Sequence, residues 1–161
     1  MIRAAREADI PGIMAVWNPI IRDTPVTFTD LEKTPEALAA LLAEKRAAGH
    51  AFLVAEAAGR VAGIAVLGQF RSGPGYRHSL EHTVLLAPEA RGRGLGRALM
   101  AAIEEAARGA GGHLLFAGVS AANPGGIAFH AALGYREVAR LAEVGFKFGR
   151  WLDLVLMEKR L

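Results

Sequence analysis

The sequence predicts an α/β domain with a mixed sheet, and two observations lead to this. Short apolar runs typical of strands alternate with segments whose apolar residues recur at helical spacing. The runs at 51–57 and 61–70 are joined by a short turn at 58–60, which predicts a hairpin. The strands expected at 79–87 and 113–119 are instead separated by a helical segment. Hairpins give antiparallel neighbours and helical crossovers give parallel ones, so one sheet should contain both.

The N-terminal third of the chain predicts a short strand and two helices. Residues 2–5 are expected to form an edge strand. Asp9 is a candidate N-cap for a helix that has a proline in its first turn and runs to about Arg22. A second helix is expected to begin at Thr34, which a proline follows directly, and to end at Gly49.

A third predicted helix follows a glycine-rich segment and runs to about Arg108. One of its faces is apolar, and charged residues are expected to lie elsewhere on it. The apolar positions are Leu95, Leu99, Ile103 and Ala106, and the charged positions are Arg97, Glu104, Glu105 and Arg108. A turn at 123–126 precedes a short helix capped by Gly134, and strands at 135–141 and 151–159 complete the sheet.

The composition excludes several classes of protein. The chain has 161 residues, 52% of them hydrophobic, which suits one globular domain spanning residues 1–161. Its formal charge is +3 and its cationic residues are scattered, so we expect no nucleic-acid partner. The absence of cysteine excludes disulfides, thiolate nucleophiles and cysteine-ligated zinc. No apolar run approaches the roughly 18 residues of a membrane span, and the N-terminus has no apolar signal core, so we expect a cytoplasmic protein without a membrane partner.

The stretch APEARGRGLGRALM, residues 87–100, places three glycines and several arginines at the mouth of a helix. A helix N-terminus carries unpaired N–H groups and a partial positive charge, and glycines before it let an anion approach the backbone. A strand, a glycine-rich turn and a helix together form a phosphate site. The alternative from spacing alone is a surface turn with solvated arginines, because this glycine spacing matches neither the dinucleotide fingerprint nor the nucleoside-triphosphate loop.

Arg91, Gly94 and Gly96 form the pattern R-x-x-G-x-G between a strand and a helix. This pattern resembles the acyl-CoA pyrophosphate loop of the GNAT superfamily of N-acetyltransferases. Asn123 and the segment FHAALGY at 129–135 resemble a second motif of that superfamily, and the order of predicted elements matches its fold. The resemblance implies a mixed, mostly antiparallel central sheet flanked by helices, and acetyl-CoA as the co-substrate.

Three further segments narrow the resemblance, which extends nearly from end to end. WNPIIRDTPVTF at 17–28, GYRHSLEHTV at 75–84 and EVGFKFGRWLD at 143–153 are similar to the phosphinothricin N-acetyltransferase-like family. That family acetylates the α-amino group of small amino-acid analogues such as phosphinothricin, methionine sulfoximine and methionine sulfone. The most family-specific part is the closing segment with Lys147, Gly149, Trp151 and Asp153.

The resemblance implies which residues hold the cofactor. The backbone at 84–86 should pair with the pantetheine amides like an added strand, and the N–H groups at 92–97 should hold the pyrophosphate. Asn123 should bond the pantetheine arm, form the turn before Pro124, or do both. The complete expected set is Val84, Leu85, Leu86, Arg91, Gly92, Arg93, Gly94, Leu95, Gly96, Arg97 and Asn123.

Glu81 is the candidate general base, because an amine must lose a proton before it attacks a thioester. A carboxylate within an apolar strand is uncommon, and desolvation there raises its pKa. The family resemblance also places the catalytic glutamate at this position. The alternative is a strand residue that faces solvent.

His130 stands where many GNAT enzymes have a tyrosine. It is a candidate to protonate or hydrogen-bond the CoA sulfur, or else a packed residue whose ring is satisfied by backbone. His78 and His82 are expected to flank Glu81 on one strand face. No third ligand appears at useful spacing, so no metal is expected.

Arg71 and Arg77 are candidates to bind the substrate's carboxylate and its sulfone or phosphinate oxygens, because arginine forms bidentate bonds to such groups. Phe28, Tyr76 and Phe148 are candidate walls of the substrate pocket. The alternative for a loop arginine is simple solvation.

Phe146, Phe148 and Trp151 would be costly to expose, and the resemblance implies a homodimer through this segment. Core packing is the alternative for these aromatic residues. Two other functions also stay open: a GNAT enzyme for a protein N-terminus or a polyamine, and a non-catalytic acyl-CoA-binding or nucleic-acid-binding module. Basic residues in the loop before Glu81 argue against a polyamine pocket, and the retained Glu81 argues against a loss of catalysis.

Overall fold

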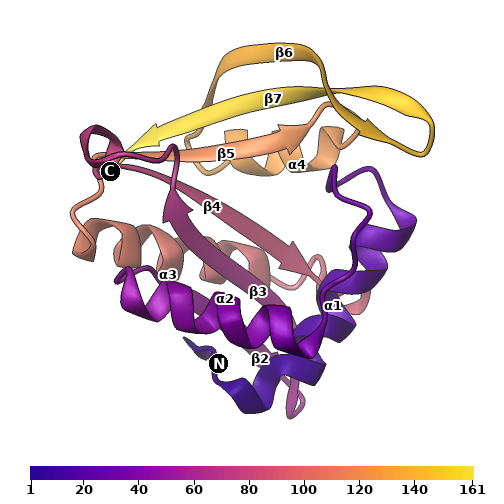
Figure 1. The fold of residues 1–161 in the computed structure, drawn as a ribbon, viewed down its shortest axis with the longest axis vertical. Helices are drawn as coiled ribbons and strands as arrows, with labels where there is room; N and C mark the ends of the chain where they lie inside the picture. The colour runs from indigo at the N-terminus through magenta and orange to yellow at the C-terminus, as the bar shows by residue number, and fades with distance from the viewer.

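The computed structural model describes residues 1–161 and contains one seven-stranded sheet in the order β1-β2-β3-β4-β5-β7-β6 (Figure 1). The strands are β1 (Ile2–Ala4), β2 (Phe52–Ala57), β3 (Arg60–Gln69), β4 (Ser79–Leu86), β5 (Leu114–Ser120), β6 (Arg136–Lys147) and β7 (Arg150–Arg160). Only β4 and β5 are parallel, because a helical crossover joins them. The predicted mixed, mostly antiparallel sheet is therefore confirmed.

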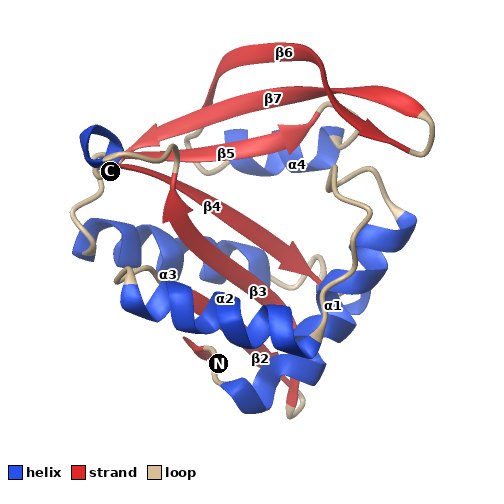
Figure 2. Cartoon of the chain, in the orientation of Figure 1, coloured by secondary structure: helices blue, strands red, loops and turns tan.

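Four helices flank the sheet: α1 (Ile10–Asp23), α2 (Pro35–Ala47), α3 (Leu95–Gly109) and α4 (Pro124–Ala131) (Figure 2). Alternate residues of the central strands supply two separate cores. Ile64 of β3 packs in the core that contains the α1 and α2 residues, whereas its neighbour Ala65 packs in the core that contains α3. This alternation follows from the two-residue period of a strand. No helix is long and apolar enough to cross a membrane.

The local signals in the first half of the chain mostly act as predicted. Thr34 caps α2 by accepting a hydrogen bond from the Ala37 N–H at 3.1 Å. Ala58 and Gly59 both have positive φ and form the two-residue turn between β2 and β3. Asp9 occupies the N-cap position of α1, but its side chain makes no capping bond to that helix. Its carboxylate instead accepts hydrogen bonds from Arg3 at 2.7 and 2.8 Å and tethers β1.

Helix α3 corrects one sequence prediction. Glu104 was expected away from the core but is 7% exposed, and its carboxylate pairs with Lys159 of β7 at 2.7 Å. Ala107, rather than the predicted Ala106, lies fully in the core beside Ile103. A buried carboxylate requires a partner, and the partner comes from a strand that is distant in the sequence.

The strand predicted at 135–141 is also longer than expected, since β6 continues to Lys147 and forms a long hairpin with β7. The register shifts between Leu141 and Gly145, and Glu143 within this irregularity has φ 55°. The Asp153 carboxylate holds the Glu143 N–H at 2.9 Å. This bulge breaks the alternation of side chains, and the sequence pattern therefore hides the second half of the strand.

The pairing of β4 changes along its length. Its ladder to β3 continues to Leu86, but its ladder to β5 ends at the pair His82–Ala117. Beyond His82 the two parallel strands diverge (Figure 1). The last four residues of β4, 83–86, therefore have an edge without a strand partner, in the middle of the sheet.

Candidate active site

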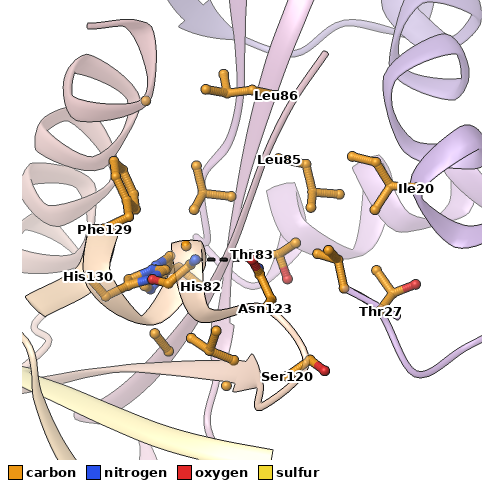
Figure 3. Close-up of a pocket in the computed structure, with 18 of the residues that line it drawn as sticks. Ile20, Thr27, His82, Thr83, Leu85, Leu86, Ser120, Asn123, Phe129 and His130 are labelled. Carbon is orange, nitrogen blue, oxygen red and sulfur yellow. Dashed lines mark hydrogen bonds between the residues drawn. The ribbon is translucent and has the colours of Figure 1, made fainter. Parts of the chain in front are cut away.

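A cavity of about 720 Å³ lies where β4 and β5 diverge (Figure 3). It passes between the two faces of the sheet: Ile20 and Thr27 lie on its α1 side, and Phe129 and His130 of α4 lie on the other. Residues from β4, β5, the α3 loop and the segment after α1 complete its walls. A cleft of this size between two strands is the natural place for a small-molecule ligand.

The free edge of β4 forms one wall of the cavity. Val84, Leu85 and Leu86, the residues predicted to pair with pantetheine, all line it. Their N–H and C=O groups on this side have no strand partner, since β5 has already turned away. An extended ligand with amide groups can add to such an edge as an extra strand.

The glycine-rich loop forms the mouth of the cavity. Gly92 and Gly94 have φ of 72° and 78°, a conformation that glycine adopts without strain, and both are exposed. Gly94 is the N-cap residue of α3 and has no side chain to cap it, so the first N–H groups of the helix stay free. Arg91 and Arg97 line the same mouth. The loop therefore presents backbone donors and two guanidinium groups to one side.

Gly96 is a third glycine at this mouth, with a different role. A Cβ on it would lie 3.2 Å from Leu86 and 3.3 Å from Phe129, so its absence keeps these walls close. Two other predicted cofactor residues are not brought to the cavity. Arg93 and Leu95 line a second cavity on the opposite side of the loop. A turn followed by a helix points successive side chains to different sides.

Asn123 lines the cavity from the start of α4. It is the N-cap residue of that helix, and its Oδ1 accepts a hydrogen bond from the Gly126 N–H at 3.0 Å (Figure 3). The turn-forming role is thus observed, and the same residue borders the space predicted for the cofactor.

Glu81 lines the cavity at the point where the β4–β5 ladder still holds. Its backbone pairs with Gly68 on one side and Phe116 on the other. The side chain is half-buried rather than facing open solvent, and desolvation raises the pKa of its carboxyl group. A carboxyl group with a raised pKa, in a cavity, suits proton transfer.

His82 and His130 meet on the α4 side of the cavity, with their Nε2 atoms 3.1 Å apart (Figure 3). His130 Nδ1 lies 2.7 Å from the Gly126 carbonyl oxygen and must donate to it. Burial lowers the pKa of both histidines and favours the neutral rings, and in a neutral His130 the Nε2 atom is then an acceptor, so His82 Nε2 must carry a proton and donate. In this neutral pair, neither His130 nitrogen has a proton free for another group.

This pair gives a first testable prediction. Desolvation lowers the pKa of both histidines, and the nearby His130 lowers that of His82 further. A lowered pKa keeps an imidazole neutral to a lower pH than usual, so at the ordinary imidazole pKa of about 6.5 both rings should be mainly neutral. Nitrogen-15 NMR should show His82 protonated on Nε2 and His130 on Nδ1. A protonated, doubly N–H ring for either residue at that pH would contradict the assignment.

Comparison with known proteins agrees with this geometry. Residues 2–156 match the family described as "Acetyltransferase (GNAT) domain". The chain belongs to the GNAT acetyltransferase family. Like its named relatives, this GNAT protein is an N-acetyltransferase.

Three relatives of known name resemble this GNAT chain over 99% of its length. The L-amino acid N-acyltransferase MnaT of Escherichia coli (strain K12) is 37% identical, and the match covers 93% of that protein. The L-methionine sulfoximine/L-methionine sulfone acetyltransferase of Salmonella typhimurium is 36% identical, with 94% covered. The phosphinothricin N-acetyltransferase of Alcaligenes faecalis is 35% identical, with 82% covered.

Two solved structures superpose on the whole chain. The ribosomal-protein-alanine N-acetyltransferase of Brucella melitensis has a TM-score of 0.96 at 42% identity, and 99% of that chain is covered. The yncA acetyltransferase of Salmonella typhimurium, solved with acetyl-CoA, has a TM-score of 0.95 at 35% identity, with 93% covered. The GNAT fold predicted from the sequence is thus confirmed.

The substrate residues predicted for this GNAT enzyme are only partly brought together. Phe28 lines the cavity, but Arg71, Tyr76 and Arg77 do not. The loop that carries these three is exposed: the Arg71 guanidinium lies 5.7 Å from the centre of the Tyr76 ring, and Arg77 donates to the Pro74 carbonyl. Phe148 lies exposed in the β6–β7 turn.

His78 does not share a site with His82. It is exposed, and its Nδ1 lies 2.6 Å from the Gly111 carbonyl oxygen, at the entrance to β4 rather than beside the cavity. His82 is buried on the opposite face from Glu81, as alternation along a strand requires.

Other lining residues of the GNAT cavity were missed by sequence reasoning. Ile20 lies in α1, and Val26 and Thr27 lie between α1 and α2. Ser120 is the last residue of β5, and Phe129 lies in α4. The first three belong to the segment 17–28 that carries the family resemblance, which was the available signal. Phe129 belongs to the segment FHAALGY at 129–135, which was the available signal there. Ser120 shows no signal of its own, because ordinary residues line a cavity wherever the fold places them.

Proposed function

We propose that this protein transfers the acetyl group of acetyl-CoA to the α-amino group of a small amino-acid analogue of the phosphinothricin, methionine sulfoximine or methionine sulfone type. The single observation that carries the proposal is the half-buried Glu81 carboxylate in a cavity that joins the free β4 edge to the glycine-rich mouth of α3. The names of the relatives support the amine class, since they act on amino acids and their analogues.

The cavity fits acetyl-CoA on chemical grounds. The mouth of α3 offers unpaired N–H groups and two arginines to a diphosphate, and the edge at 83–86 offers amide partners to a pantetheine arm. Bound there, acetyl-CoA supplies a thioester whose carbonyl carbon accepts the amine. The apolar side chains of Leu85 and Val84 exclude water from the same space.

In this proposal Glu81 removes one proton from the substrate ammonium group, because only a neutral amine has a lone pair for attack. The N–C bond forms, the C–S bond breaks, and the second proton of the nitrogen passes to the sulfur or to solvent. His130 orients the α4 wall instead of donating a proton, since the Gly126 carbonyl and His82 already engage both of its ring nitrogens.

A panel of amines tests the proposal by thiol release. We expect the highest kcat/KM for methionine sulfone, methionine sulfoximine or phosphinothricin. An alanine-starting peptide is included because of the Brucella melitensis likeness. A polyamine should react poorly, since Glu81 is the one carboxylate that lines the cavity. If the peptide is turned over faster than every analogue, the enzyme acts on protein N-termini instead. Acetyl-CoA binding without any turnover would indicate a binding module.

The diphosphate role of the α3 mouth gives a second prediction. Arg97→Ala should raise KM for acetyl-CoA by about tenfold, since a charge-assisted bond to the diphosphate is lost. S-acetylpantetheine has no diphosphate, so its KM should stay unchanged. Arg46→Ala, which removes an exposed arginine at the end of α2, serves as the control. An equal effect of Arg97→Ala on both thioesters would contradict diphosphate binding.

We further propose that the enzyme is a homodimer. The β6–β7 hairpin exposes Val144, Phe146, Phe148 and Trp151, and each has more than half of its surface accessible. The rings of Phe146 and Trp151 pack with their centres 4.8 Å apart, and exposed apolar side chains gathered on one hairpin favour a protein partner. A second copy is available to every chain. Gel filtration should give twice the chain mass of 17.0 kDa, and elution at the single-chain mass would reject the dimer.

A further inference from the structure

Lys147 has an unusual environment for a lysine. It lies near the tip of the β6–β7 hairpin, and only 2% of its surface is exposed. Lysine is almost never buried to this extent without a partner, because removing an ammonium group from water is costly. Desolvation lowers the pKa of Lys147, while the charge of Asp30 acts in the opposite direction.

The hydrogen-bond partners of this ammonium group all belong to the segment that follows α1, and Nζ also lies 5.1 Å from the centre of the Phe148 ring. Nζ donates to the Thr24 carbonyl oxygen at 2.7 Å, to the Thr27 carbonyl oxygen at 2.9 Å and to the Thr27 hydroxyl at 3.1 Å. These three acceptors use all three donors of the group. More than 100 residues separate them from Lys147 along the chain.

The same segment forms a wall of the cavity, and we name residues 24–28 the acceptor loop. Val26, Thr27 and Phe28 all line the cavity on the side of α1. Figure 3 shows Thr27 beside Ile20, on the opposite side of the cavity from His130. This is also the face of the sheet that carries Glu81, since Leu85, four residues further along β4, packs in the core that contains α1.

Gly145 provides a second contact between the hairpin and the loop. A Cβ on this glycine would lie 2.7 Å from Cγ of Phe28, which is closer than real Cβ contacts. The Phe28 ring therefore rests directly on the Gly145 backbone, and Gly145 is itself buried. The glycine is required here for close approach, since its φ is not in the left-handed region.

We propose that the β6–β7 hairpin positions the acceptor loop, and that Lys147 and Gly145 thereby determine which amines the enzyme accepts. Lys147 holds the backbone of the acceptor loop by its hydrogen bonds, and we name these bonds the latch. The Gly145 backbone supports the Phe28 ring, so Lys147 and Gly145 are both positioning residues. The assignment of this wall to the amine rests on the proposed function. The latch itself is independent of that function and is measured separately.

The first experiment measures the latch by hydrogen–deuterium exchange of a peptide covering residues 24–33. In Lys147→Met the ammonium donors are lost while the length of the side chain is kept, so exchange there should rise about tenfold. Arg150→Met is the matched control. It removes an exposed cation whose backbone pairs with Lys147 across the same turn. Unchanged exchange in Lys147→Met would overturn the latch.

The second experiment separates the two substrates kinetically in the same variants. We expect KM for the amine to rise about tenfold in Lys147→Met and KM for acetyl-CoA to change less than about twofold, since lost uniform binding appears in KM. Arg150→Met should behave like wild type. An equal rise in both KM values would overturn the acceptor-side role. Unchanged KM values for both substrates together with faster exchange would also overturn the acceptor-side role.

Gly145→Ala tests the proposal without removing the buried charge, in case Lys147→Met does not fold. It keeps the latch and displaces Phe28, so the ranking of amines of different size should change while KM for acetyl-CoA stays constant. An unchanged ranking would overturn the role of Gly145. If wild type acetylates no amine, the proposed function fails, and the exchange rates still decide the latch.

Discussion

Glu81→Gln is expected to lower kcat/KM for acetyl transfer by about 10²- to 10⁴-fold, the usual contribution of a general base. Glutamine has the same shape but cannot accept the ammonium proton. KM for acetyl-CoA should stay constant, because Glu81 lies on β4 before the free edge begins. Glu89→Gln, which changes an exposed acid in the loop after β4, is the matched control. Wild-type turnover in Glu81→Gln would remove the residue from the mechanism.

The pH dependence provides a second measurement on the same variant. Burial raises the pKa of Glu81, so wild-type kcat/KM should fall as the pH drops through that raised value and the base becomes protonated. The folded state binds this proton more tightly than the unfolded state. Stability is therefore lost as the pH rises from the ordinary pKa to the raised one. Glu81→Gln should thus have a higher Tm than wild type at about pH 8, but no advantage at about pH 3.

Lys159→Met is expected to reduce the free energy of unfolding by about 3 kcal/mol, because it leaves a buried carboxylate without its main partner. Glu104 is 7% exposed and pairs with Lys159 at 2.7 Å, while the more exposed Arg108 stays 3.9 Å away. The effect should therefore lie at the low end for buried pairs. For a chain of this size, Tm should fall by about 6 to 12 °C.

A double variant separates the loss of an ion pair from a loss of packing. Glu104→Leu combined with Lys159→Met removes both charges and leaves an apolar pair, which should recover most of the lost Tm. Lys33→Met, which changes a partly buried lysine outside this ion pair, is the control. If the double variant is less stable than Lys159→Met alone, Glu104 is not the source of the loss.

Local signals were sufficient for most of the secondary structure. The cap at Thr34, the turn at Ala58-Gly59 and the glycines before α3 act through neighbours within a few residues, so they are visible in the sequence. The second half of β6 is not visible in the sequence, because the bulge at Glu143 is held by Asp153 from the opposite strand. The burial of Glu104 was missed for the same reason, since its partner lies 55 residues away.

The candidate site also contains residues that the sequence places correctly and residues that it does not. The glycine-rich mouth and Glu81 are marked by residue types that are unusual for their positions, and both line the cavity. Arg71 and Arg77 are predicted from their charge and their place in the loop just before Glu81, but that loop stays outside the cavity. A charge on a flexible loop does not specify where it points, whereas a residue within a strand has its direction set by alternation.

By itself, the sequence determined the family, the mixed sheet, the glycine-rich mouth of α3 and the candidate base, because each depends on contiguous residues. Only the tertiary structure decided that β4 and β5 separate after His82, that the two neutral histidines meet, and that Lys147 holds the acceptor loop. The histidine pair joins residues 48 apart in the chain, and the Lys147 bond to Thr24 joins residues 123 apart. Contacts at such distances are set by the packing of whole elements, and no local pattern of residues encodes them.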